Sequence, residues 1–282
     1  MILRGLASMF ILAASALPAM AEEPPLWKLV AQSDVIVLAS VDTPAVPPPG
    51  AYVSLPLRDV AALKGETSAR PELQWYSAPR TYMPSLEQLR AADGSRSLVF
   101  ALRSEGRLYF AGYTPTAFRP ADAESVAAVE TEVLRQAGVL ARWRRDTSVP
   151  HYAEVQAIIE AIIALPPASG DERRSGPSRQ QHLFDRLIAL GPAAVPAIIE
   201  QMDDRRRLPE PQISFVNDAP NAFEGIRHYG PDVMTEALAA VLNQLTNEDF
   251  GSIYNGSTPA ERQAAVQGWR VYLDHLRNDD AA

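Results

Sequence analysis

The sequence predicts an α+β protein in which a β-rich part precedes a helical part. Between Asp34 and Tyr113, short runs of Val, Leu and aromatic residues alternate with turn residues, which is typical of strands. After Asp122 the apolar residues recur every three or four positions, which indicates amphipathic helices. The helical part also contains a Gly-Pro pair twice, at Gly191-Pro192 and Gly230-Pro231, 39 residues apart. We therefore expect a small β-barrel domain followed by an all-α domain built from helical hairpins.

The 282 residues are enough for two packed cores, and we divide them into four segments. The boundaries are 1–21 for a signal peptide, 22–120 for a β-rich domain, 121–178 for connecting helices and a polar loop, and 179–282 for a helical domain. Hydrophobic residues make up 47% of the chain, which is ordinary for a globular protein and excludes wholesale disorder.

The first 21 residues have the pattern of a cleaved signal peptide. Arg4 precedes an apolar stretch, and Ala19-Met20-Ala21 fits the small-x-small rule for cleavage. The alternative is an uncleaved anchor, since the apolar stretch is about at the lower length limit for crossing a bilayer. We expect a periplasmic or secreted protein without stable membrane insertion after cleavage.

Charge and cysteine content exclude several classes of function. The net charge is −8, all of the excess lies after Pro150, and there is no basic stripe, so we expect no nucleic-acid partner. The chain has no cysteine, which excludes disulfides, a thiol nucleophile and a thiolate metal site. An exported protein of this kind depends on its packed cores for stability.

Five runs in the β-rich segment have the length and periodicity of strands, and a short helix over Leu26–Gln32 is expected before them. Gly106 supplies the positive φ of a hairpin loop between the last two strands. Five short strands predict a small antiparallel barrel or sandwich. The runs are Asp34–Val41, Tyr52–Leu63, Glu72–Ser77, Ser97–Leu102 and Leu108–Tyr113.

The run AQSDVIVLASV (31–41), followed by VAALKG (60–65), resembles the opening strands of bacterial members of the netrin/tissue-inhibitor-of-metalloproteinase superfamily. The resemblance implies an OB-like barrel over residues 26 to about 140. Inhibitors of that superfamily chelate a protease's zinc through a mature N-terminal cysteine. The expected mature end here is Glu22 and the chain has no cysteine, so that mechanism is not available.

Two connecting helices are expected after the barrel. The first runs from Asp122, a good N-cap, to Ala137, and Gly138 is expected to end it. The second, His151–Leu165, carries a wide isoleucine face. Between them Trp143 is flanked by arginines, which indicates either an anion-binding patch or a tryptophan packed at a domain joint.

The stretch Leu183–Met202 predicts two helices joined at Gly191-Pro192, and Phe223–Val241 is a weaker copy of it. Pro196 predicts a kinked or 3₁₀ first turn in the second helix. The residues LIALGPAAVPAIIEQM (187–202) resemble HEAT-repeat helices, which implies a HEAT-like scaffold over residues 180–278. A last helix begins with the capping box Thr258-Pro259-Ala260-Glu261 and carries a central Trp269.

No catalytic or metal-binding motif is present. The chain has no HExxH, GxSxG, GxGxxG, P-loop or calcium loop, and its four histidines are scattered. We therefore assign no catalytic residue, no metal ligand and no cofactor.

Two aromatic residues of the barrel are candidates for ligand binding, namely Trp75 and Tyr76. Alternation along a strand places them on opposite faces, so at most one of them belongs to the core of a one-sided sheet.

Four residues of the helical part are further binding candidates. Asp204, Arg205 and Arg206 form a charged run; the alternative is that the arginines complement a helix C-terminus. Phe215 lies in a long loop between the two repeats, and the alternative is that it packs beneath the helices.

These features predict a non-catalytic binding or interaction protein with an unknown protein or small ligand as its partner. One alternative is a hydrolase whose acid and base come from Asp and Glu residues that are distant in sequence. Another is a protease-inhibitor-like module that works without cysteine.

Overall fold

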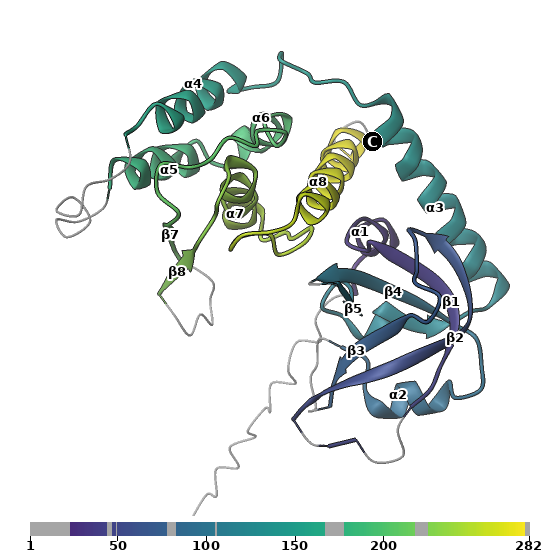
Figure 1. Cartoon of the computed structure of the whole chain (residues 1–282). Helices are drawn as coiled ribbons and strands as arrows, with labels where there is room; N and C mark the ends of the chain where they lie inside the picture. The colour runs from purple at the N-terminus through teal and green to yellow at the C-terminus, as the bar shows by residue number, and fades with distance from the viewer. Residues whose placement is uncertain are drawn as a thin grey trace, which may run out of the picture.

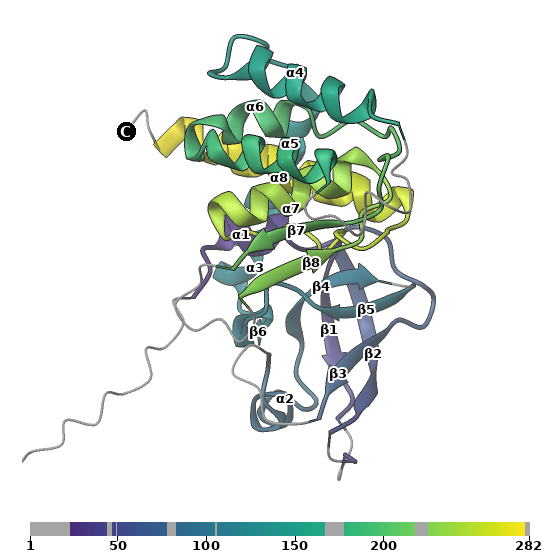
Figure 2. The same ribbon diagram turned by 90° about the vertical axis from the view of Figure 1, so that its left-hand side faces the viewer.

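A computed structural model describes residues 23–43, 47–48, 50–77, 83–104, 106–166, 178–217 and 225–279. The predicted signal peptide, the tip of the 218–224 loop and most of the polar loop before Ser178 lie outside these ranges. Figure 1 shows a β-barrel in the N-terminal part and a helical region in the C-terminal part, and Figure 2 shows the helical region stacked over one end of the barrel.

The N-terminal sheet closes on itself. Its strand order is β1-β2-β3-β5-β4, and β4 also pairs with β1, which makes a five-stranded closed barrel. All of these pairs are antiparallel except that of β3 with β5, which is parallel, so the expected wholly antiparallel sheet is wrong at this pair. The strands are β1 (Val35–Val41), β2 (Tyr52–Lys64), β3 (Glu72–Tyr76), β4 (Ser97–Ser104) and β5 (Arg107–Phe110).

The five predicted strands are confirmed, with small shifts at their ends, and Gly106 has the predicted positive φ of 76°. Two short elements were not predicted. Helix α2 (Leu86–Ala91) begins with a capping box formed by Ser85 and Gln88, and β6 (Phe118–Pro120) adds to β4 outside the barrel. Both are too short to give a periodic signal.

Strands β1 and β4 are buried on both faces. Inside the barrel, Val35, Val37 and Val99 pack in one apolar cluster. Outside it, residues of β1 and β4 such as Ile36 and Phe100 pack in a second cluster against α1 (Leu26–Ala31) and α3 (Ala123–Arg142). This two-sided burial explains why these runs are continuously apolar rather than alternating.

Helix α3 is longer than predicted. The Asp122 carboxylate accepts from the Ser125 N–H at 2.8 Å, which confirms the predicted cap. The helix then passes through Gly138 and ends at Arg142, so the predicted stop at Gly138 is wrong. Buried Gln136 and Val139 on either side of the glycine keep the helix packed beyond it.

The helical region has a single apolar core made by α4, α5, α6, α7 and α8. The predicted stripes are confirmed: Leu187, Ile198 and Trp269 are among its fully or almost fully buried side chains. The elements are α4 (Tyr152–Ile163), α5 (Arg179–Ala189), the 3₁₀ turn η3 (Pro192–Ala194), α6 (Val195–Glu200), α7 (Met234–Thr246) and α8 (Pro259–Asp279).

Local features of these helices agree with the sequence. Gly191 has a φ of 69°, and the 3₁₀ turn expected from Pro196 lies directly before α6. The Thr258–Glu261 capping box is formed, with the Glu261 N–H donating to Thr258 Oγ1 at 3.2 Å. Trp143 packs at the edge of the core, beneath the guanidinium groups of Arg270 and Arg277 from α8.

The second copy of the repeat is not a helical hairpin. The segment expected as its first helix contains strand β8 (Ile226–Tyr229), which pairs antiparallel with β7 (Ile213–Val216). Gly225, directly before β8, is unfavourable inside a helix, and each of the four residues of β8 pairs with a residue of β7. Only the second helix of that copy, α7, is confirmed.

Within the described ranges, no single helix is long and apolar enough to cross a membrane. The pair α5 and η3–α6, bent by 95°, passes that test jointly by length and composition alone. Its apolar side chains belong to the helical core.

Helix α1 joins the two parts. Its Trp27 ring lies 4.1 Å from the ring of His275 and 6.4 Å from that of Phe250, measured between centroids, so a residue of the barrel domain packs against the helical core. Lys28 forms an ion pair with Glu248.

Two more polar contacts strengthen this joint. The Gln32 amide donates to the Asp249 carbonyl at 2.7 Å, and Arg135 of α3 pairs with Asp274 of α8 at 2.9 Å. The barrel and the helical region therefore meet along a broad and partly apolar interface.

Replacement of two helical glycines by alanine should change the free energy of unfolding in opposite directions. A Cβ at Gly268 of α8 would lie 2.6 Å from Cβ of Phe250, whereas one at Gly138 of α3 would meet only the mobile end of Arg142, at 3.2 Å. Alanine is the better helix former, so Gly138→Ala should stabilise by up to about 1 kcal/mol. Gly268→Ala should destabilise by about 1–3 kcal/mol because Phe250 has to move. Urea unfolding measures both, and stabilisation by Gly268→Ala would contradict the close packing of Phe250 on α8.

Candidate functional site

A cleft of about 850 Å³ lies between the barrel and the helical region. One wall consists of residues from α1, from strands β2 to β5 and from the loop that follows β5. The other consists of the loop at 250–257 and the first two turns of α8. Its volume is typical of small-molecule binding sites, which often lie between domains.

Tyrosines form the barrel wall of the cleft. Tyr52 of β2 is the direct cross-strand partner of Tyr76 of β3, and their ring centroids are 5.2 Å apart. Tyr109 of β5, which is paired with Gln74 of β3, lies edge-on to Tyr52 at 5.9 Å. Because these strands are neighbours in the barrel, the three rings make one continuous aromatic surface. Tyr52 is 63% exposed.

A fourth tyrosine comes from the loop after β5. Tyr113 has a φ of 46°, an uncommon conformation for a residue with a side chain, and it follows Gly112, whose φ is 73°. Its side chain is 61% exposed, and its hydroxyl lies 3.4 Å from Ser252 Oγ on the opposite wall. The strained turn thus holds an aromatic ring at the mouth of the cleft.

The loop at 250–257 in the helical wall is held in place by hydrogen bonds to neighbouring segments. Ser252 Oγ donates to Asp249 Oδ2 at 2.9 Å, and Asn255 Oδ1 accepts from the Gly230 N–H at 2.8 Å. Burial raises the pKa of Asp249, while the bond from Ser252 lowers it. Phe250 is buried behind the loop, between Trp27 and Trp269.

The lining of the cleft includes one carboxylate residue from each wall, Asp34 and Glu261. Asp34 lies at the start of β1, and its Oδ2 accepts from the Arg103 N–H at 2.6 Å. Burial raises the pKa of Asp34, and the charge of Glu261 on the helical wall raises it further, whereas Arg103 and Lys64 lower it. Behind Asp34, burial lowers the pKa of Lys64 to about 8, and its ammonium donates to the Val30 carbonyl at 2.7 Å. These two hydrogen bonds hold Asp34 and Lys64 in place at the barrel side of the cleft.

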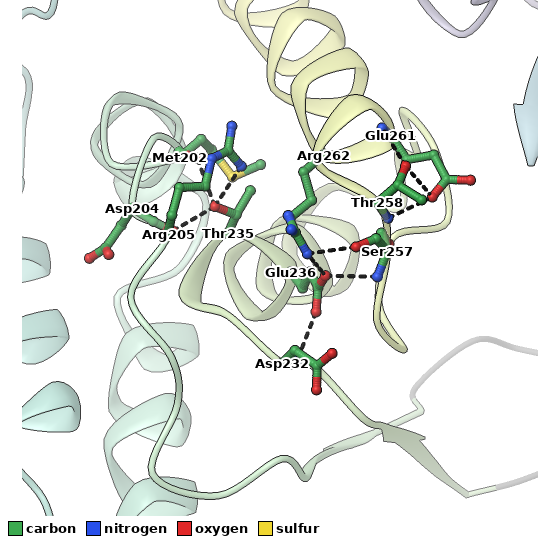
Figure 3. Close-up of polar contacts among 10 residues, drawn as sticks. All are labelled: Met202, Asp204, Arg205, Asp232, Thr235, Glu236, Ser257, Thr258, Glu261 and Arg262. Carbon is green, nitrogen blue, oxygen red and sulfur yellow. Dashed lines mark hydrogen bonds and ion pairs between the residues drawn. The ribbon is translucent and has the colours of Figure 1, made fainter.

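A second polar cluster, drawn in Figure 3, connects the elements of the helical region. Glu236 is fully buried and accepts from the N–H groups of Asp232 and Ser257 at 2.7 and 2.9 Å. It also pairs with Arg262 at 2.8 Å. These bonds tie α7 to the loop before α8 and to α8 itself, so we assign the cluster a structural role.

The two candidate residues of the barrel, Trp75 and Tyr76, lie on opposite faces of β3, as the alternation of side chains along a strand requires. Tyr76 lines the cleft. Trp75 is 3% exposed, packs inside the barrel and donates its indole N–H to the Pro84 carbonyl at 2.8 Å. Trp75 is therefore a core residue, and we remove it from the candidate ligand contacts.

The helical candidates lie away from the cleft. Asp204 and Arg206 pair with each other, and Arg206 also pairs with Glu160 of α4 at 2.7 Å. Arg205 donates to Thr235 Oγ1 at 2.9 Å, at the start of α7. Phe215 is 2% exposed and packs against Tyr229. All four side chains have contacts within the helical region, and the burial of Phe215 agrees with the alternative that it packs beneath the helices.

Sequence reasoning missed Tyr52, Tyr109 and Tyr113. Period-two alternation does place Tyr52 and Tyr109 on a defined face of their strands, but it does not reveal which faces meet across the sheet. Among the described residues there is no group of three or more His, Asp and Glu side chains that could hold a metal ion.

Breaking the buried Glu236–Arg262 pair should cost far more than breaking an exposed one. Glu236→Ala leaves the largely buried Arg262 guanidinium without its counter-ion and two N–H groups without their acceptor, and should destabilise by about 3–5 kcal/mol. The matched control is Glu160→Ala, which removes the exposed pair with Arg206 and should cost less than about 1 kcal/mol. Denaturant unfolding of both variants measures the difference, and equal small losses would contradict the structural role of Glu236.

Comparison with known proteins gives this cleft no precedent. No family model, no curated protein and no solved structure matches the chain. The chemistry of the cleft is therefore inferred from its own residues.

Proposed function

We propose that the chain is an exported, non-catalytic binding protein whose ligand occupies the cleft between the barrel and the helical region. The observation that carries this proposal is the continuous surface of Tyr52, Tyr76 and Tyr109 in a cleft of ligand-binding size. Aromatic rings gathered at an exposed concave surface are typical of recognition sites. Export rests on the sequence of residues 1–21, and a periplasmic or secreted location follows from it.

We further propose that the barrel is OB-like. Support comes from its strand order, the parallel pairing of β3 with β5, and helix α2 between β3 and β4. OB-folds bind their ligands on the face of strands 2 and 3, which corresponds to the position of Tyr52 and Tyr76 here.

The helical region is proposed to be a short HEAT-like scaffold. Support comes from the α5 to η3–α6 hairpin, bent by 95° at Gly191-Pro192, and from the single core that α4 to α8 share. Such stacks provide surfaces rather than reactive groups, which agrees with a binding role.

A hydrolase is the second candidate, and the presence of Asp34 and Glu261 on opposite walls of the cleft favours it. Two carboxyl groups in one site can act as acid and base. However, Glu261 accepts from the N–H and the hydroxyl of Thr258 in its capping box, and Asp34 accepts from Arg103. Both carboxylates thus have structural partners, which favours binding without turnover.

The cleft can be tested before its ligand is known. A library of small fragments is screened by ligand-observed NMR against the native chain, Ser104→Trp and Val216→Trp. Ser104 lines the cleft, whereas Val216 is 62% exposed on β7 and does not line it. We expect a shared set of fragment hits that Ser104→Trp removes, because the indole fills part of the cleft, and that Val216→Trp keeps.

Hits that survive Ser104→Trp would place the binding surface elsewhere and overturn the proposal. Mass spectrometry of the same samples detects cleavage of any bound compound, and turnover that Asp34→Asn abolishes would establish the hydrolase instead.

A further inference from the structure

We infer that the ligand of the cleft is a neutral saccharide that stacks a sugar ring on Tyr52 and contacts Tyr76 and Tyr109; the inference rests on the proposed function. Four properties of the cleft suit such a ligand.

The first property is the aromatic surface. The ring of Tyr76 lies 5.2 Å from that of Tyr52 and is tilted by 58° to it, and Tyr109 lies edge-on to Tyr52 at 5.9 Å, so Tyr52, which is 63% exposed, offers the main surface for stacking and the other two rings border it. The faces of aromatic rings carry negative charge density and attract the weakly positive C–H groups that line one face of a sugar ring. Tyr113, 61% exposed at the mouth, extends this surface toward the helical wall.

The second property is the kind of polar group around the tyrosines. The cleft is lined by the side-chain amides of Gln74 and Asn255 and by the hydroxyls of Ser104, Ser252 and Ser257. Amides and hydroxyls offer both donors and acceptors, as a ligand rich in hydroxyl groups requires.

The third property is charge, which disfavours a nucleic acid. The lining includes the carboxylates of Asp34 and Glu261 and the guanidinium of Arg103, which donates to the Glu66 carbonyl at 2.8 Å. Single-stranded nucleic acids also stack on tyrosines, but their binding grooves are strongly positive. A cleft with two acids and one engaged arginine disfavours an anionic ligand such as a nucleic acid, whereas a neutral saccharide meets no such repulsion.

The fourth property is the placement of the tyrosines on three neighbouring strands, which disfavours an extended peptide. Such peptides commonly add a strand along one exposed edge. Strand β2 has such an edge near Tyr52, because its pairing with β1 covers only Leu57 to Lys64, but Tyr76 and Tyr109 belong to β3 and β5. A ligand that contacts all three rings lies across the face of the sheet and is held by side chains, as a saccharide would be.

The test is a calorimetric titration of the mature chain with two probes, a tetramer of β-1,4-linked glucose and a tetramer of β-1,4-linked N-acetylglucosamine. We expect at least one probe to bind. Tyr52→Ala should weaken its Kd about 10-fold, because a stacking ring is lost, while Tyr52→Phe should stay within about 3-fold. Leu134→Ala is the control, since Leu134 is 73% exposed on α3 and does not line the cleft.

Absence of binding by both tetramers would overturn the inference, and so would binding that Tyr52→Ala and Tyr76→Ala leave unchanged. A proline-rich octapeptide and an eight-nucleotide single strand of thymidines are titrated in parallel. If either binds and Ser104→Trp abolishes it while neither saccharide binds, the saccharide inference fails and the cleft remains a binding site. If the fragment screen also shows no dependence on Ser104→Trp, the proposed function fails as well.

Discussion

The packing of Trp27 against the helical core is the contact on which the arrangement of the molecule depends. Helix α1 packs Leu29 and Val30 against the outside of the barrel and Trp27 against Phe250, Tyr272 and His275. One short helix thus belongs to two apolar clusters. Since burying a large aromatic side chain stabilises by several kcal/mol, this shared helix fixes one wall of the cleft relative to the other.

The position of the tyrosines follows from which faces of the barrel are covered. Helices α1 and α3 cover the outer faces of β1 and β4, and the apolar residues there are explained by packing. Tyr52, Tyr76 and Tyr109 lie on the outer face of β2, β3 and β5, where they line the cleft instead. Their clustering is the main reason to regard that face as a recognition surface rather than as part of a core.

Local signals predicted much of the fold, while the site depended on tertiary structure. The strands, the caps at Asp122 and Thr258 and the 3₁₀ turn at Pro192 follow from residues near one another in sequence, and all of them are formed. The prediction of a second helical hairpin was wrong at β8, because pairing with β7 outweighed the sequence similarity to α5. The cleft unites β2, β3, β5 and the loop before α8, and no sequence pattern shows that segments so far apart in the chain meet.

Amide chemical-shift mapping in the presence of the bound tetramer measures most directly whether the cleft is the binding site. Both walls should respond together, with the largest shifts at Gln74 and Tyr76 on the barrel and at Gly256 and Ser257 on the helical wall. Shifts confined to one wall, or to β7–β8 and α4 outside the cleft, would contradict a site formed jointly by the barrel and the helical region.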